Sequence, residues 1–78
     1  MNKNEFINQV VATLRKVNDL ILDRQWAVAE LHLRASLRAT SAHLGREHPL
    51  YGEIRKRIRR LFETEINYNE KRNEACEI

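Results

Sequence analysis

The chain has 78 residues, a formal net charge of +3 and a hydrophobic fraction of 42%. This length predicts a single domain with one small core, which buries about 60% of the unfolded surface and leaves little room for an enclosed catalytic pocket. The sequence therefore disfavours an enzyme. With only two glycines and one proline among many good helix formers, it predicts an all-α fold.

A single cysteine, Cys76, cannot form an internal disulfide or a structural zinc site, which favours a reducing compartment. The opening segment "MNKNEF" is polar, and no apolar run reaches the length of a signal core or a membrane span. We therefore expect a soluble, cytoplasmic protein.

The first expected helix starts at Asn2 or Asn4, either of which can cap it, and ends near Asp23. Its apolar residues recur every three or four positions and form one stripe. The stripe contains Ile7, Val10, Leu14, Val17 and Ile21, and it is widened by Phe6, Val11 and Leu20. Asp23 is then expected to cap the next helix, which begins at Gln25.

The second expected helix runs from Gln25 to Leu44 and carries apolar residues on two sides. One stripe contains Trp26, Ala29, Leu33, Leu37, Thr40 and Leu44, and the other contains Val28, Leu31, Ala35 and Ala42. A helix with two apolar stripes contacts two neighbours, so we expect it to be the middle helix of three.

Gly45 stands where a helix-ending glycine with positive φ belongs, and Pro49 fits the first turn of a third helix, which should reach at least Tyr68. Its apolar side holds Ile54, Ile58, Leu61 and Phe62. The sequence thus predicts a three-helix, up-down-up bundle over residues 1–68. We expect residues 69–78 to form a frayed or disordered acidic tail.

One series of residues has a characteristic spacing: an aromatic, an Ala-Glu pair, spaced leucines, then "LGREHP" and further apolar positions. They are Trp26, Ala29, Glu30, Leu33, Leu37, Leu44, Gly45, His48, Pro49, Ile58, Leu61 and Phe62. The series resembles the tetratricopeptide repeats of the kinesin-light-chain type over roughly residues 12–68. The resemblance implies tetratricopeptide-like helix packing, in which Trp26 and Leu37 hold a helix pair together, and a surface that accepts an acidic peptide or protein.

The pattern also departs from that family. Arg24 stands where these repeats usually carry a glycine, Arg59 stands at a position for a small residue, and Lys71-Arg72 replaces the next Ala-Glu pair. Since solenoids usually need about three repeats, the chain must close on itself, dimerise or dock onto a partner.

The basic charge is concentrated in one segment. Residues 49–62 hold five basic residues and one acidic residue, giving +4, whereas residues 63–78 hold two basic and five acidic residues, giving −3. The helical spacing places four basic side chains away from the apolar side, and we predict that they bind a partner: Arg55, Lys56, Arg59 and Arg60.

Three interpretations of this basic face remain open. It could bind an acidic protein, or it could contact phosphates as the reading helix of a small helix-turn-helix-like regulator of the mobile-element type. It could also be a solvated face with ion pairs from Arg59 and Arg60 to Glu63. The helices are long for a helix-turn-helix, and no Asn, Gln, Ser or Thr set accompanies the arginines. We therefore favour a protein partner.

We predict no catalytic residue, metal ligand or cofactor. His43, Glu47 and His48 are close in sequence but lack a fourth ligand, because His32 is about three helical turns from His43. The hydroxyl residues of the second helix have no nucleophile setting, and no glycine-rich phosphate loop occurs.

We also expect a homodimer. Apolar residues broaden the first helix beyond what one neighbour covers, and two more extend past the end of the bundle, which would expose an apolar patch in a monomer. These residues are Phe6, Val11, Leu20, Leu22, Ile66 and Tyr68.

Overall fold

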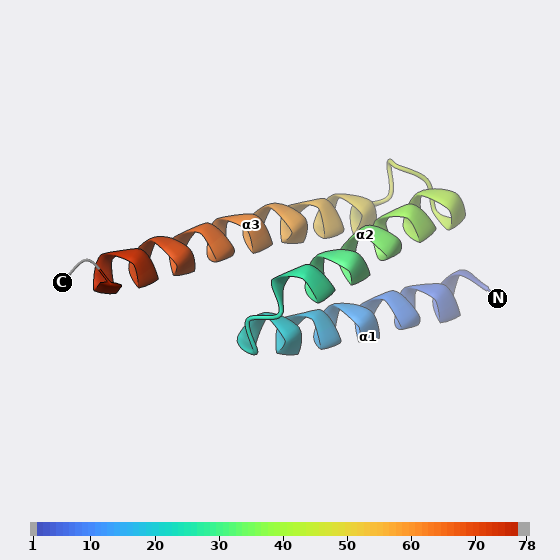
Figure 1. Cartoon of the computed structure of the whole chain (residues 1–78). Helices are drawn as coiled ribbons and strands as arrows, with labels where there is room; N and C mark the ends of the chain where they lie inside the picture. The colour runs from blue at the N-terminus through green and yellow to red at the C-terminus, as the bar shows by residue number, and fades with distance from the viewer. Residues whose placement is uncertain (1, 77–78) are drawn as a thin grey trace.

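The computed structural model of the protein describes the backbone of residues 2–76 and the side chains of residues 2–71. This part of the chain forms three α-helices: α1 (Lys3–Leu22), α2 (Trp26–His43) and α3 (Pro49–Cys76). The helices run up, down and up, and α2 packs against both α1 and α3 (Figure 1). The predicted all-α, three-helix bundle is therefore confirmed, with α2 as its middle helix. None of the helices described is apolar over a stretch long enough to cross a membrane.

Helix α1 begins as the sequence predicts. The side chain of Asn2 accepts a hydrogen bond from the backbone N–H of Glu5 at 2.8 Å, which is the geometry of an N-cap. Such a cap satisfies one of the first N–H groups of the helix, which have no partner inside it.

The predicted role of Asp23 as the cap of α2 is wrong. Asp23 ends α1, and Gln25 stands at the N-cap of α2 without a side-chain hydrogen bond. The reason lies in Arg24, whose φ of 59° is left-handed. The backbone N–H groups of Arg24 and Gln25 therefore turn back to the carbonyls of Ile21 and Leu20, each at 2.9 Å. This is a Schellman ending, which draws Asp23 into the end of α1.

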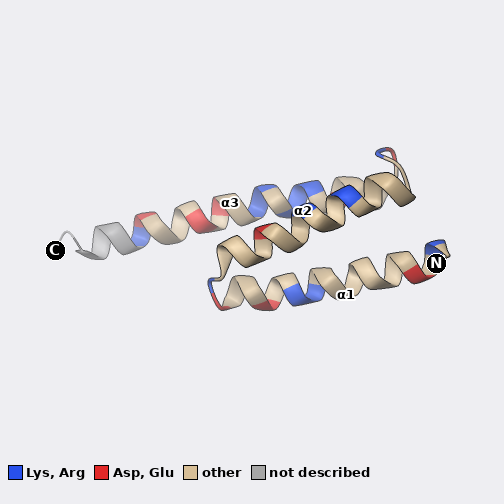
Figure 2. Cartoon of the chain, turned by 45° about the vertical axis from the view of Figure 1, so that its right-hand side comes forward, with Lys and Arg blue, Asp and Glu red and all other residues tan. Residues whose placement is uncertain are grey.

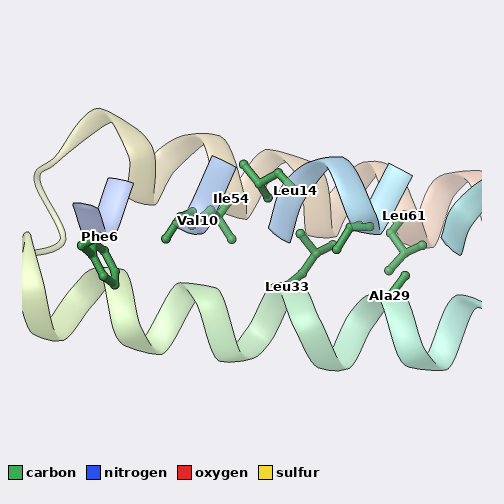
Figure 3. Close-up of a cluster of buried hydrophobic side chains, with 8 residues drawn as sticks. Phe6, Val10, Leu14, Ala29, Leu33, Ile54 and Leu61 are labelled. Atoms are coloured by element: carbon green, nitrogen blue, oxygen red, sulfur yellow. The ribbon is translucent and has the colours of Figure 1, made fainter. Parts of the chain in front are cut away.

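The core lies between all three helices (Figure 3). Its buried apolar residues are Phe6, Val10, Leu14 and Val17 from α1, Ala29 and Leu33 from α2, and Ile54 and Leu61 from α3. On α1 the stripe is rotated slightly from the prediction. Phe6 is buried and Ile7 is only half-buried, while Val11 is 38% exposed.

Helix α2 buries one stripe rather than two. Its buried residues are Ala29, Leu33, Ser36 and Thr40, whereas the predicted second stripe faces solvent, with Val28 40% and Leu31 68% exposed. The buried residues of α1 and of α3 form one core cluster with Ala29 and Leu33, so α2 buries a single face. Helices α1 and α3 make little direct contact, which includes the hydrogen bond from Arg57 to the side-chain oxygen of Asn18 at 3.2 Å.

The buried stripe of α2 includes polar side chains. Thr40 is fully buried, and its hydroxyl has no hydrogen-bond partner among the described residues. Ser36 is nearly as buried, with 8% of its surface exposed. Since a buried hydroxyl without a partner lowers stability, Thr40 is a weak point of the core.

The connection between α2 and α3 matches the prediction. Gly45 has φ +89° and donates its N–H to the carbonyls of Thr40 and Ser41 at 3.1 and 3.2 Å. Pro49 is the first residue of α3. The ring nitrogen Nδ1 of His48 accepts a hydrogen bond from the backbone N–H of Leu50 at 3.1 Å. The histidine thus caps α3 in the way that Asn2 caps α1.

Helix α3 is longer than the packed part of the bundle. Tyr68 lies at the far end of the bundle, with its ring centre 6.0 Å from that of Trp26 and 4.7 Å from the guanidinium carbon of Arg24. The helix then continues through Cys76, past the predicted domain boundary at Tyr68. The last two residues of the predicted tail, 77–78, lie outside the described residues.

Candidate partner-binding surface

The four basic residues singled out by the sequence lie on the outer face of α3. Arg55, Lys56, Arg59 and Arg60 are all exposed, while Ile54 and Leu61 are buried beneath the same turns. Residues one helical turn apart share a face, which is why the four basic side chains point away from the core together. Figure 2 shows their charge as a block in the first half of α3, beside further basic residues of α2.

These four side chains form no ion pair with any described residue, so the pairs of Arg59 and Arg60 with Glu63, which belonged to the solvated-face interpretation, do not form. The ion pairs that do form join Arg34 to Glu30 at 2.8 Å and Arg57 to Glu53 at 3.3 Å. In both, the glutamate precedes the arginine by four positions, the order that the helix dipole favours. Glu63 follows its arginines, which is the weaker order. The outer face therefore keeps its positive charge.

Arg57 differs from its basic neighbours because it is half-buried. Besides its contact with Glu53, it donates to Asn18 of α1 at 3.2 Å. Arg57 thus joins α3 to α1, and its charge is partly neutralised. Helical spacing had already set Arg57 apart from the other four basic residues, but nothing in the sequence indicated its contact with Asn18.

An open groove of about 360 Å³ lies between α2 and α3. Its apolar lining consists of Leu37, Ile58 and Phe62, and its basic lining consists of Arg34, Arg55 and Arg59. Phe62 remains 37% exposed, and the guanidinium carbon of Arg34 lies 6.0 Å from the centre of its ring. A positively charged groove with an apolar floor can hold an apolar side chain while its arginines bind carboxylates.

The four predicted residues do not converge on this one groove. Arg55 and Arg59 line it, whereas Arg60 lines a second, smaller hollow of about 120 Å³ between α1 and α3, beside Arg57. Lys56 is exposed and lines neither hollow. The structure thus divides the predicted site and adds Arg34, a residue of α2 that the sequence analysis did not select.

The four residues predicted to have structural roles lie in the groove, against the core or in the connection between α2 and α3. Leu37 is half-buried, packs against the core and lines the groove. Trp26 is also half-buried against the core and faces Tyr68. Gly45 and Pro49 form the connection that places the start of α3 beside the end of α2.

Two of the three histidines, His43 and His48, have structural contacts. The ring of His43 packs on Phe6 with 4.6 Å between ring centres, and His48 caps α3. Among the residues described, no three His, Cys, Asp or Glu side chains come together as a metal-binding group.

Comparison of the chain with protein-family models, curated proteins and solved structures found no match.

Proposed function

We propose that this protein is a non-enzymatic interaction module that binds an acidic segment of another protein along the groove between α2 and α3. The observation that carries the proposal is the composition of that groove, in which an apolar floor is flanked by Arg34, Arg55 and Arg59. Of these, Arg55 and Arg59 have no ion pair within the described residues. Their guanidinium groups suit carboxylates, which they can bind through two parallel hydrogen bonds.

The floor of the groove defines the rest of the ligand. Leu37, Ile58 and Phe62 can bury one or two apolar side chains, whereas a uniformly charged segment would leave this surface in contact with water. The expected ligand is therefore a short segment in which aspartate or glutamate residues alternate with a leucine or phenylalanine anchor.

We further propose that the helices pack in the tetratricopeptide-like manner. Two features support this. Arg24 occupies the position where those repeats carry a glycine, and it has the left-handed φ of 59° that glycine adopts easily. The helix stop at Gly45 and the restart at Pro49 occur within the "LGREHP" segment that carries the resemblance.

The alternative is a nucleic-acid-binding regulator, which the outward-facing row of Arg55, Lys56, Arg59 and Arg60 favours. Phosphate binding would use all four cations and would not need the apolar floor. The two functions therefore differ in which residues matter: Phe62 on the groove floor for an acidic peptide, and Lys56 and Arg60 for a nucleic acid.

A binding titration tests the proposal. A labelled peptide with glutamates around a leucine-phenylalanine pair is titrated at low salt, in parallel with duplex DNA and single-stranded RNA. We expect the variant Arg55→Glu/Arg59→Glu to bind the peptide at least about tenfold more weakly. The matched control is Arg15→Glu/Lys16→Glu, which makes the same change of charge on exposed positions of α1.

The outcomes separate the two functions. An equal loss in the control and in the groove variant would mean that only net charge matters, and the groove would have no role. Binding of DNA or RNA without binding of the peptide would favour the regulator. In that case Lys56→Glu/Arg60→Glu should weaken binding as strongly as the groove variant, and the dependence on salt should be steep.

A further inference from the structure

The two halves of α3 carry opposite charge. Residues 49–62 have a net charge of +4 and residues 63–78 a net charge of −3, and both lie largely on one straight helix. In Figure 2 the basic block of α3 is followed along the helix by acidic residues. The glutamates of the second half that the structure describes, Glu63, Glu65 and Glu70, form no ion pair with any described residue.

An apolar strip crosses the junction between the two halves. Ile58, Phe62 and Ile66 are spaced four residues apart and share one side of α3. Ile58 is half-buried in the groove, Phe62 is 37% exposed, and Ile66 is 55% exposed. The strip therefore starts on the groove floor and becomes more exposed toward the end of the helix.

The part of α3 that follows Tyr68 extends beyond the other helices, because Tyr68 still packs against Trp26 at the start of α2. Figure 1 shows α3 continuing past the turn between α1 and α2, and the residues after Tyr68, namely Asn69, Glu70 and Lys71, are exposed. Ile66 precedes the contact of Tyr68 with Trp26, yet it remains 55% exposed, and the glutamates around it form no ion pair with any described residue. A ligand for this half must bring apolar surface and positive charge, and the first half of α3 offers both.

We infer that a second copy of this chain covers the groove, with the two α3 helices antiparallel about a two-fold axis near Phe62. This inference rests on the proposed function, since the second copy supplies the acidic segment. Residues equally far before and after Phe62 then lie at the same level along the two helices. Ile58 lies at the level of the partner's Ile66, and Arg59 lies at the level of the partner's Glu65. A parallel arrangement would place positive charge on positive charge, which disfavours it.

Such an interface is self-complementary, as a two-fold axis requires. Every contact occurs twice, so the two basic halves meet the two acidic halves while the Phe62 rings of both copies meet at the centre. Another acidic protein that binds the groove must then displace the second copy. Self-association therefore competes with partner binding, and the free protein is held in a state in which its groove is closed.

Sedimentation equilibrium of the full chain at micromolar concentration tests the inference. We expect wild-type protein to be a dimer of the 9.3 kDa chain, and we expect Arg55→Glu/Arg59→Glu and Glu65→Lys/Glu70→Lys each to dimerise at least about tenfold more weakly. A mixture of the two variants should recover the mixed dimer. The control Arg15→Glu/Lys16→Glu should dimerise like wild type, and circular dichroism verifies that every variant is folded.

A chain with all four α3 substitutions tests the orientation. Its charges are exchanged between the two halves, so it should dimerise with itself but not with wild type. Formation of mixed dimers between this chain and wild type would mean that the two α3 helices are parallel, and it would overturn the inference. A dimer that is insensitive to both double variants would place the interface elsewhere and would overturn it as well. A wild-type monomer that still binds the acidic peptide would overturn the dimer alone, while a dimer that no acidic peptide displaces would contradict the proposed function.

Discussion

Replacing Thr40 by valine should stabilise the protein by about 1–2 kcal/mol. Thr40 is 0% exposed, and its hydroxyl has no partner among the described residues, a state that costs about 1–3 kcal/mol. Valine has nearly the same shape, its additional methyl group contributes apolar contacts, and its helix propensity is close to that of threonine. The substitution therefore removes a cost without creating a cavity.

Thermal unfolding followed by circular dichroism measures this gain. In a domain of this size each kcal/mol raises the melting temperature by about 4–8 °C, so the variant should melt about 5–15 °C higher than wild type. The comparison must use one protein concentration, because association between copies also raises the melting temperature.

The matched control is Thr13→Val on α1. The hydroxyl of Thr13 is at the surface and donates to the carbonyl of Gln9 at 3.0 Å, so we expect a change within about 0.5 kcal/mol. A melting temperature for Thr40→Val that is equal to or below that of wild type would show that the Thr40 hydroxyl is satisfied in solution, and the reasoning would be wrong. An equal gain in Thr13→Val would show that valine acts through propensity alone.

The two glycines should respond to alanine with opposite signs. Gly45→Ala should destabilise by about 1 kcal/mol because its φ of +89° is costly for alanine, whereas Gly52→Ala, inside α3 with open space around it, should stabilise by about 1 kcal/mol; melts that shift in one direction would contradict this. His48→Ala should cost about 1 kcal/mol through the lost cap of α3. His48→Asp, whose side chain can also cap a helix, should regain the lost free energy of unfolding in urea. Equal stability of His48→Ala and His48→Asp would show that the cap is unimportant.

Much of the fold could be predicted because the helix ends have local causes. Asn2, Gly45 and Pro49 act through their own backbone or through a neighbour within a few residues, so their roles are visible in the sequence. Asp23 was misjudged because its role depends on the left-handed Arg24, a conformation that arginine rarely adopts. The exposed stripe of Val28 and Leu31 depends on where α1 and α3 pack on α2, which periodicity within α2 does not reveal.

The candidate site shows the same division. The basic face of α3 follows from helical spacing alone, so Arg55, Lys56, Arg59 and Arg60 could be selected. The groove could not, because it depends on the rotation of α2 against α3 that brings Arg34 beside Phe62. Arg34 and Leu37 are one helical turn apart and so lie on the same side of α2. This spacing could have identified Arg34 as a basic neighbour of Leu37, but the sequence analysis did not use it.

The sequential packing of the helices bears on how fast the chain folds. Helix α2 packs against the helix before it and the helix after it, and the connections between them span only residues 23–25 and 44–48. Closing such short loops costs little chain entropy, and topologies rich in local contacts fold in microseconds to milliseconds. Rapid closure shortens the time in which the core residues of a nascent chain can aggregate, although Val28 and Leu31 remain exposed even after folding.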